Sequence, residues 1–216
     1  MRSLLEKFLQ VKLPDLLNNH DVYNEFSLQH ELGIYLRDEL RKQNPDYRVQ
    51  FERNATSYFG IVGTVKHEID IAVFKMDADG NPTEKLAAIE LKFPKNGQHP
   101  EQMYQFVKDI SFMEQVKNGG FEQAYCITLV DDPKFYEKKN KITEIYSYFR
   151  VEENGGEAIP FKPEVIIKPT GNGEGSVELT ASHKTKSVEL TAFHETKWKK
   201  FPSNDLAQYR YYLLEI

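Results

Sequence analysis

The chain has 216 residues, of which 40% are hydrophobic and 12% aromatic, so it holds enough apolar material for one sizeable core. Its 28 Lys and Arg against 33 Asp and Glu give a net charge of −5, which excludes a uniformly basic surface but leaves room for a local basic groove. The single cysteine, Cys126, cannot form an intramolecular disulfide, which suits a reducing cytoplasm. No apolar stretch is long enough to span a bilayer, and charges interrupt residues 1–14 before a signal-peptide core, so we expect a cytoplasmic protein without membrane contact.

Helical and strand patterns alternate in the first half of the chain. Apolar residues at helical spacing near the start predict a short helix that ends at Pro14, and a second amphipathic helix is predicted over residues 23–43. Alternating apolar and polar residues then predict three strands, at residues 47–53, 66–74 and 85–93. The segment between the last two is rich in Asp, Gly, Asn and Pro, which predicts a hairpin turn around Asp79 and Gly80.

The following elements predict an α/β sheet. Apolar residues at helical spacing indicate a helix after Pro100 that stops at a pair of glycines, and residues 121–130 form a strongly apolar strand. A strand, a crossover helix and another strand predict at least one parallel pair. An Asp-Pro start signal predicts a further helix over residues 132–150, and residues 209–216 predict a last strand that joins the sheet.

An internal repeat marks the C-terminal third. The segment SVELTASHKTK begins at Ser176, and SVELTAFHETK begins at Ser187, an offset of 11 residues. Two copies are too few for a solenoid, so we expect a duplicated strand that forms an extra hairpin. The repeat places His183 and His194 at equivalent positions, which suggests a metal site, but we favour equivalent positions on neighbouring strands without a ligand.

Two of the predicted strands carry acidic residues on one face. Side chains alternate along a strand, so Asp70 lies opposite Ile69 and Ile71, and Glu90 shares a face with Lys92. If the two strands pair as a hairpin, Asp70 and Glu90 come close across the ladder. Two carboxylates in an apolar sheet repel each other unless a cation lies between them, and hard oxygen ligands suit magnesium or manganese. Lys92 would then lie beside a metal-bound water and orient it or favour its deprotonation.

This arrangement resembles the PD-(D/E)xK superfamily of restriction-endonuclease-like nucleases. The matching residues are Asp70 in EIDIAVF and the triplet Glu90-Leu91-Lys92 in AIELKF, each in a predicted strand and followed by a helix and a further strand. The likeness covers residues 22–130, and Ile69 stands where the motif has Pro, a freely varied position.

The resemblance implies one α/β domain over residues 1–216, a restriction-endonuclease-like mixed sheet flanked by helices. Its core would span about residues 22–150. A C-terminal β-rich extension would follow over about residues 160–216. The implied function is divalent-metal-dependent hydrolysis of DNA phosphodiester bonds, with magnesium or manganese as cofactor and DNA as partner. Cleavage of both DNA strands with one active site per chain would favour a homodimer.

The resemblance also implies roles for individual residues. Asp70, Glu90 and the backbone carbonyl of Leu91 would bind the metal, and Lys92 would position the nucleophile. The family's helix carboxylate is assigned to Glu25, which lies at the N-terminal end of the inward stripe of the second helix.

Other charged residues near the motif are weaker candidates. Glu31 stays an alternative to Glu25 as the helix carboxylate, and Glu52 is an extra carboxylate on the first strand. Lys95 and His99, in the loop after the motif, are candidates for substrate contact. Asp109 is expected to be a surface charge on the next helix.

The triplet is a weak motif on its own. With this many acidic and basic residues, chance alone gives roughly four acidic-x-basic triplets, so the strand context carries the hypothesis. One alternative is an amphipathic hairpin with solvated charges. Another is a catalytically inactive restriction-endonuclease-like domain that binds nucleic acid or a protein partner, and a third is a hydrolase for smaller phosphoesters.

Overall fold

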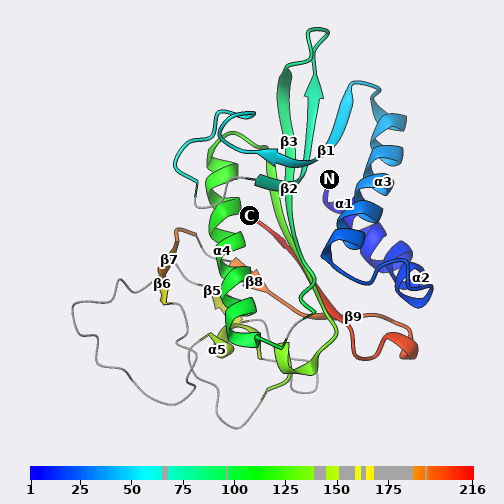
Figure 1. Cartoon of the computed structure of the whole chain (residues 1–216), viewed down its shortest axis with the longest axis vertical. Helices are drawn as coiled ribbons and strands as arrows, with labels where there is room; N and C mark the ends of the chain where they lie inside the picture. The colour runs from blue at the N-terminus through cyan, green and yellow to red at the C-terminus, as the bar shows by residue number, and fades with distance from the viewer. Residues whose placement is uncertain are drawn as a thin grey trace.

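A six-stranded mixed sheet lies at the centre of the computed structural model, which describes residues 1–64, 68–95, 97–138, 145–150, 159–161, 164–167, 187–192 and 194–216 (Figure 1). In spatial order its strands are β1 (Tyr47–Asn54), β2 (Glu68–Met76), β3 (Pro82–Lys92), β4 (Gln123–Val130), β10 (Arg210–Glu215) and β9 (Lys199–Lys200). β3 and β4 are parallel, and the other neighbouring pairs are antiparallel. The prediction of a mixed α/β sheet with a parallel pair is therefore confirmed.

Two long helices, α3 (Glu25–Gln43) and α4 (His99–Asn118), cover opposite faces of the sheet (Figure 1). Leu32 and its neighbours on α3 pack with Ile89 of β3, whereas Ile110 of α4 packs with Ala88 on the other face. Successive residues of β3 therefore belong to different cores, as the alternation of a strand requires. None of the helices in the described ranges is both long and apolar enough to cross a membrane.

The hairpin formed by β2 and β3 is confirmed. Gly80 adopts φ +87° in the turn, a backbone conformation that residues with a Cβ atom rarely adopt. Ile71 lies opposite Ile89, which is the last pair of the ladder toward the start of β2. Asp70 and Glu90 therefore lie just beyond the end of the regular pairing.

The expected alternation of β2 breaks at the same point. Ile69 and Ile71 were expected on one face, but Ile69 packs in the core under α4 and Ile71 in the core under α3. The neighbouring strand is irregular here, because Glu52 lies between the pairs Phe51–Ile71 and Arg53–Ile69 and adopts φ +49°. A distorted partner strand is a physical reason for the lost alternation.

Pro14 does not end the N-terminal helix, so that prediction is wrong. α1 (Arg2–Lys7) continues through a π-helical turn, η1 (Phe8–Lys12), into α2 (Leu13–Asn18). Pro14 lies in the first turn of α2, where a residue without an N–H group is tolerated. The wider π turn accommodates the proline without stopping the helical path.

The predicted helix over residues 132–150 is also wrong in the part that the structure describes. Asp132 caps only a short 3-10 helix, η2 (Pro133–Phe135), by accepting a hydrogen bond from the backbone N–H of Lys134. Residues 136–138 are not helical, and a single turn, α5 (Tyr146–Phe149), follows later. The Asp-Pro signal therefore begins a turn that the buried Phe135 and Tyr136 tie to the core.

The second copy of the repeat pairs with earlier segments of the chain. Its β7 (Ser187–Leu190) is antiparallel to β6 (Glu164–Ile167), and its β8 (His194–Thr196) is antiparallel to β5 (Ile159–Phe161). A last 3-10 turn, η3 (Asn204–Leu206), precedes β10. The first copy, including His183, lies outside the described residues.

Close contact between α3 and β1 generates a stability prediction. A Cβ atom added at Gly33 would lie 2.1 Å from the ring of Phe51, which is itself covered by the guanidinium of Arg37. Gly33→Ala should therefore destabilise the protein by about 1–3 kcal/mol through overpacking, although Gly→Ala in a helix normally stabilises. Urea unfolding measures the change.

A double-mutant cycle with Phe51→Ala is the control. Gly33→Ala should be neutral or stabilising once the ring is removed. Additive effects of the two changes would contradict the close contact.

Candidate active site

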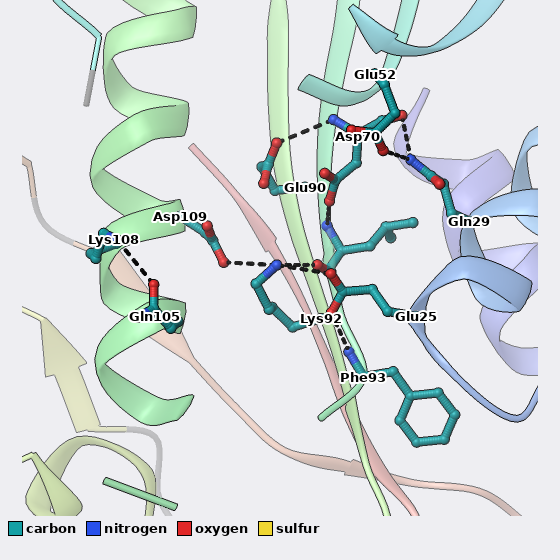
Figure 2. Close-up of polar contacts among 11 residues, drawn as sticks. Glu25, Gln29, Glu52, Asp70, Glu90, Lys92, Phe93, Gln105, Lys108 and Asp109 are labelled. Carbon is teal, nitrogen blue, oxygen red and sulfur yellow. Dashed lines mark hydrogen bonds and ion pairs between the residues drawn. The ribbon is translucent and has the colours of Figure 1, made fainter. Parts of the chain in front are cut away.

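Charged side chains from four elements converge where the β2–β3 ladder ends (Figure 2). Asp70 comes from β2, Glu90 and Lys92 from β3, Asp109 from α4 and Glu25 from the first turn of α3. The two strands, the helix over one face and the end of the opposite helix thus contribute to one cluster. The structure brings together all four residues that the motif and the resemblance singled out.

Asp70 and Glu90 replace the missing ladder bonds with their own carboxylates. The Leu91 N–H donates to Asp70 Oδ2 at 2.8 Å, and the Asp70 N–H donates to Glu90 Oε1 at 3.2 Å. Both residues are buried, Glu90 almost completely at 1% exposure. Hydrogen bonds from backbone N–H groups stabilise buried carboxylates and fix their orientation. The pair is therefore a rigid part of the sheet.

Lys92 lies between carboxylates of the two long helices. Its Nζ is 3.1 Å from Glu25 Oε1 and 3.6 Å from Asp109 Oδ2, and it also donates to the Leu91 carbonyl at 3.0 Å (Figure 2). The lysine is mostly buried, so these ionic contacts are weakly screened by solvent. They fix the position of the ammonium group.

The surroundings raise the pKa of Lys92 above its usual value. Burial alone lowers this pKa, but the negative charges of Asp109, Glu25, Asp70 and Glu90 together raise it by more. The ammonium therefore stays protonated throughout the physiological pH range. It is a fixed positive charge rather than a proton donor at neutral pH.

The structure places Glu25, and not Glu31, beside the motif lysine. Asn24 and Ser27 form a capping box that starts α3, which sets Glu25 in its first turn. The second oxygen of Glu25 accepts the backbone N–H of Phe93 at 3.1 Å, so this carboxylate ties the start of α3 to the end of β3. Glu31 instead lies 3.4 Å from His30 of its own helix.

Gln29 and Glu52 extend the polar network to β1. Gln29 Nε2 donates to Glu52 Oε1 at 2.5 Å and to the Asp70 carbonyl at 2.8 Å. Glu52 was predicted as an extra carboxylate, whereas Gln29 was not predicted as part of the site. The available signal was helical spacing, because Gln29 lies three residues before the buried Leu32 and is itself buried.

The expectation that Asp109 is a surface charge is wrong. Asp109 is only 7% exposed and faces Lys92. Its position could have been predicted, because it follows Phe106 by three residues and precedes Met113 by four, which places it on the buried stripe of α4. A charged residue on such a stripe needs a buried partner, and Lys92 provides it.

Lys95 and His99 pair with acidic residues that follow β4. Lys95 Nζ lies 2.6 Å from Asp131 Oδ2, and His99 Nε2 lies 2.6 Å from Asp132 Oδ2. These pairs join the loop after β3 to the loop after β4, beside the charged cluster rather than within it. Their contact with a substrate stays a prediction.

The donor set of Asp70 and Glu90 fits a hard divalent cation. Both side chains end in hard oxygen atoms, the donor type that magnesium and manganese prefer. Among the described residues no group of three or more His, Cys, Asp or Glu forms a ready ligand set. Magnesium often binds through one or two carboxylates and keeps several waters, so two carboxylates suit its chemistry.

Charge balance favours the same ion. Acidic side chains outnumber basic ones in the cluster, because the buried Asp70, Glu90 and Asp109 have only the Lys92 ammonium among them. Burial of net charge is costly, and a divalent cation would offset this excess of acidic groups.

Replacement of Lys92 should make stability depend on pH. In the native protein the pKa of Lys92 is raised, so its ammonium group contributes fully to the free energy of unfolding below the unfolded-state pKa of about 10.4. This contribution is lost as the pH rises from there through the higher pKa of the folded state. Lys92→Met removes this charge and should cost about 3 kcal/mol at pH 8. The cost should be smaller at pH 11, because the native protein has begun to lose the ammonium's contribution above about pH 10.4.

Urea unfolding at pH 8 and pH 11 measures both values. Lys75→Met is the matched control, because Lys75 pairs with Glu84 at the surface and should give a much smaller change at either pH. An equal cost of Lys92→Met at both pH values would contradict the electrostatic origin.

Comparison with known proteins adds no relative. The chain matches no family model, and neither a curated protein nor a solved structure is similar enough to count as a match. The likeness to the PD-(D/E)xK superfamily therefore depends on the motif residues and their placement.

Proposed function

We propose that the protein is a divalent-metal-dependent nuclease of the PD-(D/E)xK type that hydrolyses DNA phosphodiester bonds. One observation carries the proposal: the end of the β2–β3 ladder brings Asp70 and Glu90 into a buried, hydrogen-bonded pair, with Lys92 next to it. A solvated surface hairpin would not bury two carboxylates. This supports a chemical role for the pair.

The chemistry of phosphodiester hydrolysis matches the residues present. Bound by Asp70 and Glu90, a magnesium or manganese ion would polarise a phosphoryl oxygen and lower the pKa of a coordinated water. Lys92 supplies a permanent positive charge beside the pair, which stabilises negative charge that develops on the phosphoryl oxygens. Glu25 and Asp109 hold its ammonium group in place.

Exposure indicates the direction from which DNA would approach. The side chain of Glu25 is 42% exposed, that of Lys92 is 16% exposed, and Glu90 is almost completely buried. The cluster thus opens to solvent on the side of Glu25 and the start of α3. A phosphate that arrives there meets Lys92 before it reaches the buried pair.

The overall charge supports a need for a cation. The chain carries a net charge of −5, and phosphate would be repelled by the carboxylates of the cluster. A bound divalent cation reverses this local repulsion. A homodimer would supply the two active sites that cleavage of both DNA strands requires.

A catalytically inactive domain that binds nucleic acid or a protein partner is the second candidate. The observation in its favour is the internal network, in which Lys92 donates to the Leu91 carbonyl and Asp70 accepts the Leu91 N–H. Such bonds use groups that an active site needs for metal and water. The two candidates differ in whether the pair binds a cation.

Cleavage of supercoiled plasmid tests the nuclease proposal. Asp70→Asn and Glu90→Gln preserve size and one acceptor oxygen, so the backbone hydrogen bonds can persist while the charge is lost. Each change should lower magnesium-dependent nicking by at least about a hundredfold, because metal binding and transition-state charge stabilisation depend on these carboxylates. Glu84→Gln, on the exposed part of the same strand, should leave the rate unchanged. Equal nicking by all variants would exclude this site.

Calorimetric titration with manganese separates the two candidates without DNA. The native protein should bind manganese, and Asp70→Asn should weaken the binding by at least about tenfold because a charged ligand is lost. Glu84→Gln again serves as the control. If Asp70→Asn leaves the affinity for manganese unchanged and the native protein does not cleave DNA, the inactive domain is favoured.

A further inference from the structure

Glu114 of α4 is a buried carboxylate outside the charged cluster, and it binds the C-terminal part of the chain. It is 4% exposed. Its oxygens accept the backbone N–H groups of Thr191 and Ala192 at 2.9 Å, and the hydroxyl of Thr191 at the same distance. Its Oε1 also lies 2.6 Å from Nε2 of the buried His194. One side chain thus contacts three residues of this segment.

Ser111, one helical turn before Glu114, extends this recognition. Its hydroxyl donates to the Glu189 carbonyl at 2.9 Å. Val188 and Leu190, on either side, are buried in the core that α4 covers. Ser111 and Glu114 with this apolar core form a segment-binding site for residues 187–194.

Each residue that makes these contacts has an identical counterpart in the first copy of the repeat. The counterparts, eleven positions earlier, are Val177, Glu178, Leu179, Thr180, Ala181 and His183. The two eleven-residue copies differ only where Ser182 and Lys184 stand for Phe193 and Glu195. Neither of these positions contributes to the contacts with Ser111 and Glu114 described above.

We propose that the segment-binding site on α4 accepts either copy of the repeat, so that residues 176–183 are an alternative occupant for the place of residues 187–194. The chain then has two registers that differ by eleven residues. The same hydrogen-bond donors, the same histidine and the same two apolar side chains are available in both. The inference is independent of the proposed nuclease activity.

The lengths of the connections permit the exchange. In the structure, 19 residues (168–186) join β6 to the antiparallel β7, whereas the other register would leave only the eight residues 168–175. Connections between neighbouring elements are usually short, so the second length is the more ordinary. The eleven residues would move to the connection before Trp198, and closure entropy changes only slowly with loop length.

Fixed contacts on the C-terminal side confine the exchange. Trp198 Nε1 donates to the Phe149 carbonyl at 2.8 Å, and its ring packs against Tyr212 of β10 with centroids 5.0 Å apart. β9 and β10 follow directly and belong to the main sheet. The main sheet and its charged cluster can therefore stay in place while the register changes between β6 and Trp198.

Hydrogen exchange of the full chain, followed by mass spectrometry, tests the proposal. Peptides from the two copies have different masses because of the two differing positions. Leu190→Asp blocks the second copy, since Leu190 is 1% exposed, and Leu179→Asp is the matched change in the first copy. In Leu190→Asp, residues 176–183 should exchange at least about tenfold more slowly than in the double variant. Leu179→Asp alone should leave the exchange of residues 187–192 unchanged.

The proposal is overturned if residues 176–183 in Leu190→Asp exchange as fast as in the double variant, or if both proteins unfold at the same temperature. A milder pair of substitutions, one in each copy of the repeat, gives the same comparison. Thr191→Pro removes an N–H group that Glu114 accepts, and Thr180→Pro is its counterpart. Both single variants should keep the segment bound, whereas the combination should lower Tm by more than the sum of the two single effects.

Discussion

The exchange of hydrogen bonds between Asp70 and β3 is the interaction on which the charged cluster depends. Where regular pairing stops, the two carboxylates take over the role of backbone carbonyls and hold the strands together. This keeps negative charge inside an otherwise apolar sheet. Lys92, Glu25 and Asp109 are then arranged by the need to balance that charge. Stability and the proposed chemistry therefore rely on the same few groups.

Much of the fold could be predicted from periodicity. The hairpin, the parallel pair and both long helices follow from alternation or helical spacing over many residues. Local stop signals were less reliable. Pro14 does not end the helical path, because a π turn precedes it and the helix continues. The Asp-Pro sequence before η2 begins only a short turn, because Phe135 is buried in the core. Tertiary packing decides whether a helix starts or stops at such residues, and a short stretch of sequence does not reveal that packing.

The candidate site was predictable where residues are close in sequence or share a strand pair. Asp70, Glu90 and Lys92 follow from one hairpin. Asp109 and Gln29 were missed because a charge or an amide on a helix is usually solvated, and its partner lies far along the chain. Both lie on buried helical stripes. A polar residue on an apolar stripe is therefore the pattern that would have found them.

The left-handed backbone at Glu52 has a consequence for association. β1 is an edge strand of the described sheet, and an exposed edge with regular pairing groups invites addition of a further strand from another molecule. The distortion at Glu52 interrupts the regular row of donors and acceptors. The opposite edge, β9, has only two residues. Both borders of the six-stranded sheet are therefore poor templates for the addition of a strand from another molecule.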